Sequence, residues 1–337
     1  MAKQFLQRIS TKELSHAGEI HAQLGRYLFQ QKQNDLALAE LIRFKQSGHQ
    51  DVDALFMLAT LENSAGADAD AVEDALRLER DSSLSGRQRA VAARIAGLSY
   101  GNLNQFEEAI RHLTLAIELA PPQLGSLVEN CYLAIAELYQ GKQDPQGARR
   151  ALEQGSKVLK TSSKLPLALG SILLAAGDYP AAVEVLTELT LRFPDEVEAY
   201  NGLAQAYTLL GEVKLATKAL EQISQRQPGY PMVDVMIAQS ILREQPPDRD
   251  KALSRLTQAE KMSPTDADIY YLRAKIYVSI GRYEEALDAM RGAVELEPTE
   301  ANFYYQLGII YQKLGRPALA KEQFERMSHL RNTTSPR

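Results

Sequence analysis

Cross-linking and membrane-spanning features are almost absent from this sequence. Cys131 is the only cysteine, which excludes an internal disulfide framework and a cysteine-rich zinc site. No stretch approaches the roughly 18 consecutive apolar residues of a membrane-spanning helix. The first residues lack the apolar segment and the cleavage site of a secretory signal. We therefore expect a cytoplasmic protein, or a periplasmic or secreted one if a leader was removed.

Groups that carry catalytic or metal chemistry are few and scattered. None of the five histidines belongs to a metal-binding pair such as H-E-x-x-H. The acidic residues between Asp68 and Asp74 lack the glycine of a calcium-binding loop, and they suit the positive end of a helix instead. There is no glycine-rich phosphate loop and no nucleophile elbow. We expect no enzymatic activity, no cofactor and no metal site.

The overall charge of the chain does not favour binding to a nucleic acid. The chain has 38 lysines and arginines against 43 aspartates and glutamates, which gives a net charge of −5. Small basic spots occur, for example at Arg149 and Arg150, but they form no continuous stripe of the kind that follows a phosphate backbone. Nucleic acid is therefore not an expected partner.

A ladder of nine alanines runs through the sequence. Neighbouring members lie 34 residues apart, and three short insertions at 86–89, 124–128 and 231–232 account for every larger spacing. A fixed period of this length is typical of stacked helix pairs that bury their apolar faces only against neighbouring pairs. We expect the insertion at 86–89 to lengthen a loop. The alanines are Ala37, Ala71, Ala109, Ala148, Ala182, Ala216, Ala252, Ala286 and Ala320.

Setting the ladder alanine at position 20 divides residues 18–334 into nine units. Position 8 is small and position 24 apolar in every unit, which suits two antiparallel helices in close contact. Five glycines share the turn between the helices, where a left-handed residue is expected, and five prolines share position 32, just beyond the second helix. The glycines are Gly66, Gly177, Gly211, Gly281 and Gly315, and the prolines are Pro121, Pro194, Pro228, Pro264 and Pro298. The units are 18–51, 52–85, 90–123, 129–162, 163–196, 197–230, 233–266, 267–300 and 301–334, followed by a tail at 335–337.

The two ends of the chain leave alternatives open. In the segment 1–17, Ala2, Leu6 and Ile9 keep the spacing of a second helix, so this segment is either half a repeat or a short amphipathic cap. At the other end, Phe324 and Met327 lie on an apolar face with no further helix to cover it. That face is buried inside the last hairpin, or it docks another molecule, or the part that covered it was cut away.

The residues within the units resemble the tetratricopeptide repeat family. Its repeat favours an aromatic residue at position 4, Leu at 7, a small residue at 8, Tyr at 11 and Ala at 20. Departures from that pattern are Pro166 at position 4 and Glu62 and Arg243 at position 11. The resemblance covers residues 18–334 and implies an all-α fold, a right-handed superhelical α-solenoid of antiparallel helix pairs. The ninth unit is among the best matches, with Tyr304, Leu307, Gly308, Tyr311, Ala320 and Phe324.

The resemblance implies a concave groove lined by the first helices, which positions 2, 5, 9 and 12 face. Tyr271 and Tyr305 are the strongest candidates for contact with a partner, because Tyr270 and Tyr304 beside them take the core position 4. Position 6 holds no Asn in any unit, so we expect neither the family's clamp for chaperone carboxylates nor a concentrated cationic anchor. The groove candidates are Phe56, Asn63, Arg94, Leu133, Asn201, Gln205, Tyr271, Lys275, Tyr305 and Gln312.

These features predict a non-catalytic scaffold that binds a protein or an extended peptide and acts as an adaptor in a larger assembly. Two other functions stay open. In the first, the chain is the regulatory or substrate-recruiting region of a larger enzyme. In the second, it self-associates as a homo-oligomer, with the terminal helix of one copy in the groove of another.

Overall fold

The structure is a computed structural model that describes residues 17–230 and 232–334. That part of the chain consists of α-helices and one short 3-10 turn, with no strand. None of the described helices has the length and apolar composition of a membrane span. The segment that contains Ala2, Leu6 and Ile9 lies outside the described residues, so its assignment as half a repeat or a cap stays open.

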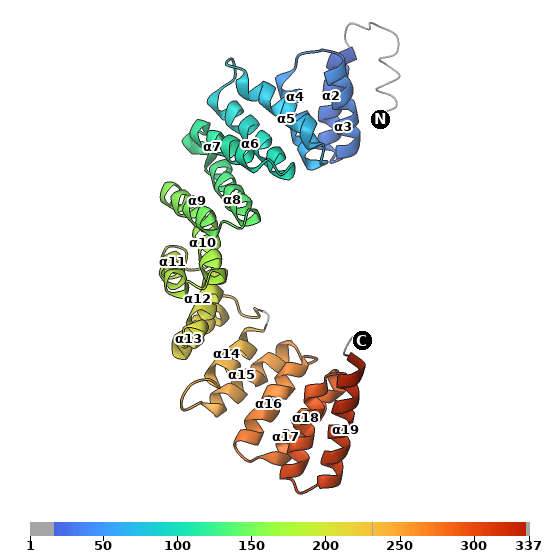
Figure 1. The fold of residues 1–337 in the computed structure, drawn as a ribbon, viewed down its shortest axis with the longest axis vertical. Helices are drawn as coiled ribbons and strands as arrows, with labels where there is room; N and C mark the ends of the chain where they lie inside the picture. The colour runs from blue at the N-terminus through green and yellow to red at the C-terminus, as the bar shows by residue number, and fades with distance from the viewer. Residues whose placement is uncertain (1–16, 231, 335–337) are drawn as a thin grey trace. The chain divides into compact units, whose positions relative to one another are not determined.

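Consecutive helices form antiparallel pairs, as the 34-residue period predicts (Figure 1). The first helices of the pairs are α2 (Ala17–Gln30), α4 (Val52–Ser64), α6 (Gly86–Asn102), α8 (Gly125–Gly141), α10 (Lys164–Ala175), α12 (Val197–Leu209), α14 (Val233–Ile241), α16 (Ala267–Ser279) and α18 (Ala301–Lys313). The second helices are α3 (Asn34–Gln46), α5 (Asp68–Arg80), α7 (Phe106–Leu119), α9 (Pro145–Val158), α11 (Tyr179–Arg192), α13 (Val213–Arg226), α15 (Arg249–Met262), α17 (Tyr283–Leu296) and α19 (Pro317–Thr334). The 3-10 turn η2 (Pro122–Leu124) precedes α8.

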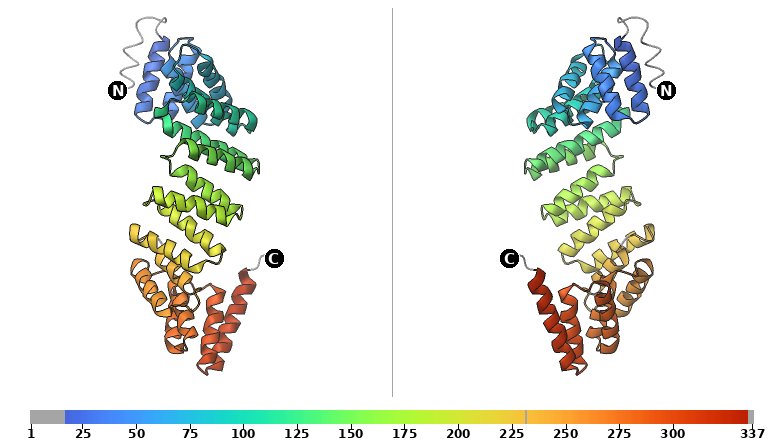
Figure 2. Two further views of the ribbon diagram at one scale, coloured as in Figure 1. Left: turned by 90° about the vertical axis from the view of Figure 1, so that its left-hand side faces the viewer. Right: turned by 90° about the vertical axis from the view of Figure 1, so that its right-hand side faces the viewer.

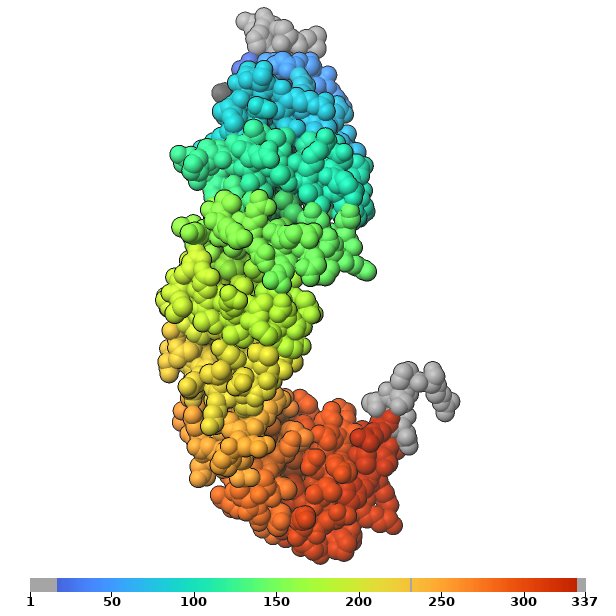
Figure 3. Space-filling view, turned by 60° about the vertical axis from the view of Figure 1, so that its left-hand side comes forward, coloured from blue at the N-terminus to red at the C-terminus, as the bar shows by residue number. Residues whose placement is uncertain are grey.

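The chain divides into two compact units, Met1–Ile172 and Leu173–Arg337, and the division falls within α10. Inside each unit the second helix of one pair packs on the first helix of the next, for example α5 on α6 and α13 on α14. The colours of each unit therefore follow one another in chain order in Figures 2 and 3. Each unit is an all-α solenoid segment in which a pair is stabilised mainly by its sequence neighbours.

The alanine ladder lies at the centre of each helix pair. All nine ladder alanines are at most 1% exposed. A β-carbon added to Gly97, at position 8, would lie only 2.7 Å from Cγ of Leu113, at position 24 of the same unit. Gly25 has the same relation to Leu41, at 2.6 Å. The small residue at position 8 therefore makes room for the large one at position 24, as the sequence predicts.

The turns between paired helices use the left-handed backbone conformation. The five glycines predicted there have φ between 70° and 77°. Three other repeats carry Lys32, Asn104 and Gln143 at the same position, with φ of 58° to 59°. Left-handed backbone costs an L-residue about 1 to 2 kcal/mol because Cβ crowds the following carbonyl oxygen. The turn in each of these three repeats is therefore strained, and a glycine there would relieve the strain.

Replacing Gln143 by Gly should raise the stability of the first unit by about 0.5 to 1 kcal/mol. The relief of left-handed strain exceeds the extra entropy that glycine loses on folding. Gly281→Ala is the matched opposite change, since a β-carbon there meets no atom within 4 Å and acts on the backbone alone. It should destabilise by about 1 kcal/mol. Urea denaturation followed by circular dichroism checks both, and a loss of stability in Gln143→Gly would contradict the assignment.

The insertion at 86–89 does not lengthen a loop, contrary to the sequence prediction. It forms the first turn of α6, which has 17 residues. Ser85 caps this helix in a capping box: its hydroxyl accepts from the Gln88 backbone N–H, and the Gln88 side chain accepts from the Ser85 N–H. A capping box satisfies two backbone N–H groups at a helix N-terminus, so it favours the start of a helix at this point in the sequence. The insertion at 124–128 likewise completes η2 and begins α8, also of 17 residues.

The apolar face of the last helix is partly covered within its own unit. Phe324, Met327 and Leu330 of α19 pack against the core that α16, α17 and α18 build. The ring of Tyr304, the largest fully buried side chain there, is 1% exposed. Part of this face is therefore buried inside the last hairpin, and the other two alternatives stay open for the part that is exposed.

Candidate functional site

In the first unit, the four predicted groove residues are half-buried or hydrogen-bonded between helices, and they line neither of the hollows described below. Phe56 is half-buried and packs against the cores around α4 and α6. The Asn63 side-chain amide donates to Asp68 Oδ1 at 3.2 Å and to Ser99 Oγ at 2.9 Å, which ties α4 to α5 and α6. Arg94 of α6 and Leu133 of α8 are half-buried. Phe56 and Asn63 thus hold neighbouring helices together.

In the second unit, two hollows follow one another along three successive first helices. The smaller, about 300 Å³, lies between α12 and α14 and includes Gln205, Leu209 and Met236 in its lining. The larger, about 510 Å³, lies between α14 and α16. Gln239 of α14 and Arg243, just beyond the end of α14, line both. We call the two hollows together the α12–α16 groove.

Three of the predicted residues line the α12–α16 groove: Gln205, Tyr271 and Lys275. Tyr271 is held from the next repeat, because its ring lies 5.3 Å from the Phe303 ring and its hydroxyl accepts from the Asn302 amide at 3.1 Å. The Lys275 ammonium lies 5.4 Å from the centre of the Tyr271 ring. An aromatic side chain fixed on one side in this way offers its remaining surface to a ligand at little cost in entropy.

The other three predicted residues of this unit do not line either hollow. Asn201 is half-buried on α12, and its Oδ1 has no hydrogen-bond partner among the described residues. Tyr305 is 43% exposed, with its ring 5.9 Å from the Phe324 ring. Gln312 is exposed near the end of α18. The sequence register thus finds the exposed side of these helices, but it does not find where the surface is hollow.

Two important residues of the groove, Gln239 and Arg243, were not predicted. They occupy positions 7 and 11 of their repeat, which are apolar or aromatic in the family pattern. In α14 the apolar side chains Ile237 and Ile241, at positions 5 and 9, are buried instead, at 0% and 1% exposure. In this repeat, apolar residues stand at positions 5 and 9 and polar ones at positions 7 and 11, the reverse of the family pattern. This exchange could have revealed the two groove residues from the sequence, because it indicates a first helix that turns a different face to the core.

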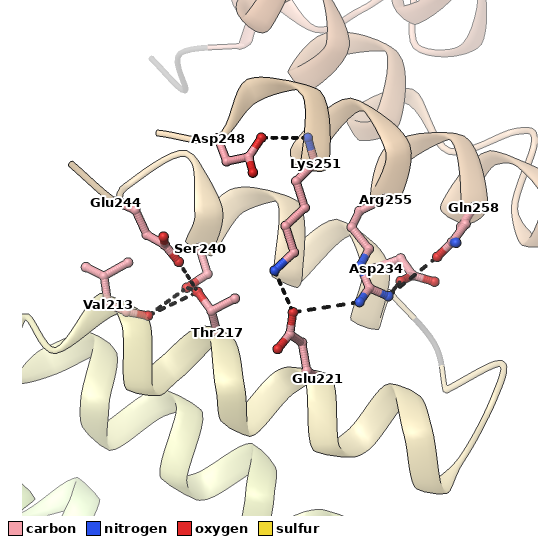
Figure 4. A network of polar contacts seen from close by, with 10 residues as sticks. All are labelled: Val213, Thr217, Glu221, Asp234, Ser240, Glu244, Asp248, Lys251, Arg255 and Gln258. Atoms are coloured by element: carbon pink, nitrogen blue, oxygen red, sulfur yellow. Dashed lines mark hydrogen bonds and ion pairs between the residues drawn. The ribbon is translucent and has the colours of Figure 1, made fainter. Parts of the chain in front are cut away.

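A buried polar network holds α14 in this orientation (Figure 4). The Thr217 hydroxyl of α13 lies 2.9 Å from Ser240 Oγ and 3.0 Å from Glu244 Oε1. It also reaches the Val213 carbonyl oxygen at 3.1 Å. Thr217 and Ser240 are buried, so an unmatched hydroxyl here would cost about 1 to 3 kcal/mol. The network therefore favours one orientation of α14 on α13, with Gln239 and Arg243 directed to the groove.

Ion pairs extend the same contact toward the far end of α13. Glu221 lies 2.9 Å from the Lys251 ammonium and 3.8 Å from the Arg255 guanidinium, both on α15. Arg255 also pairs with Asp234 of α14 at 3.0 Å (Figure 4). Ion pairs as exposed as these contribute little to stability individually. As a connected network they fix how the sixth and seventh repeats pack on each other.

The α12–α16 groove carries positive charge, contrary to the expectation from the sequence that the groove lacks a concentrated cationic anchor. Arg243, Arg249 and Lys275 line the larger hollow, and neither hollow has an aspartate or glutamate in its lining. The Arg249 guanidinium donates to Ser279 Oγ at 2.9 Å. Arg243 and Arg249 stand at positions 11 and 17, outside the positions that the family pattern assigns to the groove, so the register alone could not reveal them.

Comparison with known proteins gives matches along both units. Models of the tetratricopeptide repeat match residues 95–123, 167–231 and 248–289, and a TPR repeat model matches 274–315. Anaphase-promoting complex subunit 7 of Dictyostelium discoideum is 23% identical over 193 residues, which are 56% of this chain and 33% of that protein. The Hsp70-Hsp90 organizing protein of Triticum aestivum is 25% identical over 209 residues, 59% of this chain and 33% of that protein. The chain thus spans about a third of the length of these two relatives.

A solved structure shares the fold. The C-terminal part of a TPR repeat-containing protein from Cytophaga hutchinsonii superposes with a TM-score of 0.57 at 16% identity, covering 75% of this chain and 99% of that one. The two proteins agree in the all-α arrangement of stacked helix pairs. With its period, its buried ladder, its left-handed turns and these matches, the chain belongs to the tetratricopeptide repeat family.

Proposed function

We propose that this protein is a non-catalytic scaffold that binds an extended peptide segment of a partner protein along the α12–α16 groove. The observation that carries the proposal is the continuity of the two hollows, which Gln239 and Arg243 share. A compact ligand needs one enclosed cavity, whereas an extended chain fits hollows that follow one another along successive helices.

The lining supplies the two kinds of contact that an extended peptide needs. Gln205 and Gln239 are exposed amides that can both donate to and accept from a peptide backbone. Leu209, 57% exposed, Met236 and Tyr271 present apolar surface for side chains of the ligand. Alternate side chains of an extended segment point to the same side, so they can enter such hollows in turn.

The names of the relatives support an adaptor role. One is named as a subunit of the anaphase-promoting complex and another as an organizing protein for Hsp70 and Hsp90. Both names describe proteins that work by contact with other proteins. We extend this role to the present chain as an adaptor within a larger assembly, in which the groove holds one component while other surfaces stay available.

A bulky side chain placed between the two hollows tests the proposal. Peptides selected on the purified protein from a random display library should bind Gln239→Trp at least about tenfold more weakly than the wild type, because the indole blocks the passage from one hollow to the other. Isothermal titration calorimetry measures the affinities, and circular dichroism verifies that helicity is unchanged.

Lys218→Trp is the matched control. Lys218 is exposed on the second helix α13 and lines neither hollow, so the same substitution there should leave the affinity unchanged. If the selected peptides bound Gln239→Trp and the wild type equally well, the ligand would lie elsewhere and the groove assignment would be wrong.

A further inference from the structure

We propose that the segment docked in the α12–α16 groove is acidic, an inference that rests on the proposed function and specifies its partner. The larger hollow is lined by three cations, Arg243, Arg249 and Lys275, and no acidic side chain lines either hollow. This local excess of positive charge contrasts with a whole-chain net charge of −5. A surface of opposite sign to its own protein selects partners by electrostatic complementarity.

Two acidic residues beside these cations are engaged elsewhere. Glu244 follows Arg243 in the sequence, but its carboxylate accepts from the Thr217 hydroxyl on α13 (Figure 4). Asp248 precedes Arg249 and caps α15 by accepting from the Lys251 backbone N–H at 2.9 Å. Among the described residues, no carboxylate forms an ion pair with any of the three cations that line the hollow. Their charges are therefore available to a ligand.

The three cations come from three different elements, so they suit an extended ligand. Arg243 follows the end of α14, Arg249 begins α15 and Lys275 lies in α16. Arg243 also lines the smaller hollow, which places one cation where the two hollows meet. In an extended peptide, carboxylates at every second position face the same side at a spacing of about 7 Å. Such a segment can pair with cations on successive helices while its backbone bonds to Gln239.

A protein segment explains the lining better than a nucleic acid does. Polyanions need many cations along a continuous stripe, and here three cations stand among apolar groups such as Leu209, Met236 and Leu272. Apolar surface of this kind buries amino-acid side chains. We therefore infer an acidic peptide with apolar residues between its carboxylates.

Three synthetic peptides of equal length test the inference. All carry Leu and Tyr at the same positions, and the remaining positions are Glu, Gln or Lys. The Glu peptide should bind the wild type at least about tenfold more tightly than the Gln peptide in low salt, and the difference should shrink as salt is raised. The double variant Arg243→Gln/Lys275→Gln should abolish the preference for Glu, so that it binds the Glu and Gln peptides with equal affinity.

The double variant Lys214→Gln/Lys218→Gln is the charge-matched control, since both lysines are exposed on α13 and line neither hollow. It should retain the preference for Glu. If the Glu and Gln peptides bound equally and Gln239→Trp weakened both, the acidic preference would be refuted while the peptide-binding function stood. Failure of all three peptides to bind would count against both. Tighter binding of single-stranded oligothymidine than of the Glu peptide would overturn the assignment to an acidic protein segment.

Discussion

Replacing Glu62 by Gln should make the first unit more stable than the wild type at pH 9, by about 2 to 4 kcal/mol, and leave it almost unchanged at pH 5. Glu62 stands at position 11 of the second repeat, where the family pattern has tyrosine. It is only 3% exposed, and Asp74, 1% exposed, lies close enough to act on it electrostatically. The variant keeps the shape of the side chain and removes its charge.

Burial and the negative charge of Asp74 raise the pKa of Glu62 from an ordinary 4.5 to about 8. Lys45 opposes the shift, but its ammonium is directed to Asp74, 2.8 Å from Oδ1. Glu62 Oε2 and Asp74 Oδ2 have no hydrogen-bond partner among the described residues, so no hydrogen bond at these two oxygens stabilises a second negative charge. The folded state therefore holds Glu62 in its protonated form at neutral pH.

A raised carboxyl pKa means that protonation favours the folded state. The stabilisation is complete below the unfolded pKa of 4.5 and is lost as the pH rises through about 8. Urea denaturation of wild type and Glu62→Gln between pH 5 and pH 9 measures the difference. Glu73→Gln on the neighbouring helix α5, where 74% of the Glu73 side chain is exposed, removes an equal charge and is the control, which should not show the gain in stability at pH 9. A constant difference between wild type and Glu62→Gln would refute the buried protonated carboxyl.

Truncating Leu113 to Ala should destabilise the first unit by about 2 to 5 kcal/mol. Leu113 is fully buried at position 24, and its Cγ occupies the space that a β-carbon of Gly97 would need. Gly97→Leu alone should also destabilise, by about 1 to 3 kcal/mol, because the added side chain collides with Leu113 and with the Ala109 carbonyl oxygen at 3.0 Å.

Combining the two changes should recover part of the loss. In Gly97→Leu/Leu113→Ala the large side chain moves from position 24 to position 8 and fills part of the cavity, so the double variant should be more stable than the sum of the single effects implies, by at least about 1 kcal/mol. Chemical denaturation of the four proteins in a double-mutant cycle measures this coupling. Strictly additive effects would show that the two positions do not share one space.

The regular parts of the fold could be predicted because each depends on contacts within one repeat. The buried alanine ladder, the left-handed glycines and the prolines beyond the second helices all act locally. The start of α6 was missed because a Ser85–Gln88 capping box outweighs the glycine that opens the helix.

The candidate site could be predicted only where its repeat follows the family register. Tyr271, Lys275 and Gln205 line the groove as expected for positions 5 and 9. Gln239 and Arg243 could not be placed by that register, because in α14 the buried residues include Ile237 and Ile241, at positions 5 and 9 that the register assigns to the groove. The orientation of this helix depends on hydrogen bonds across two repeats, and no periodic pattern within one repeat contains them.

The network around Thr217 also bears on how the second unit reaches its native state. Repeat arrays fold by propagation from one pair to the next, and purely apolar contacts tolerate small errors in alignment. At the contact between α13 and α14, a misaligned neighbour would remove the contacts of Thr217 with Ser240 and Glu244 and would leave the buried Ser240 hydroxyl unpaired, while Thr217 kept its bond to the Val213 carbonyl oxygen. The polar contacts thus favour the correct stacking of the sixth and seventh repeats over a misaligned one, and the α12–α16 groove depends on that stacking because α14 lines both of its hollows.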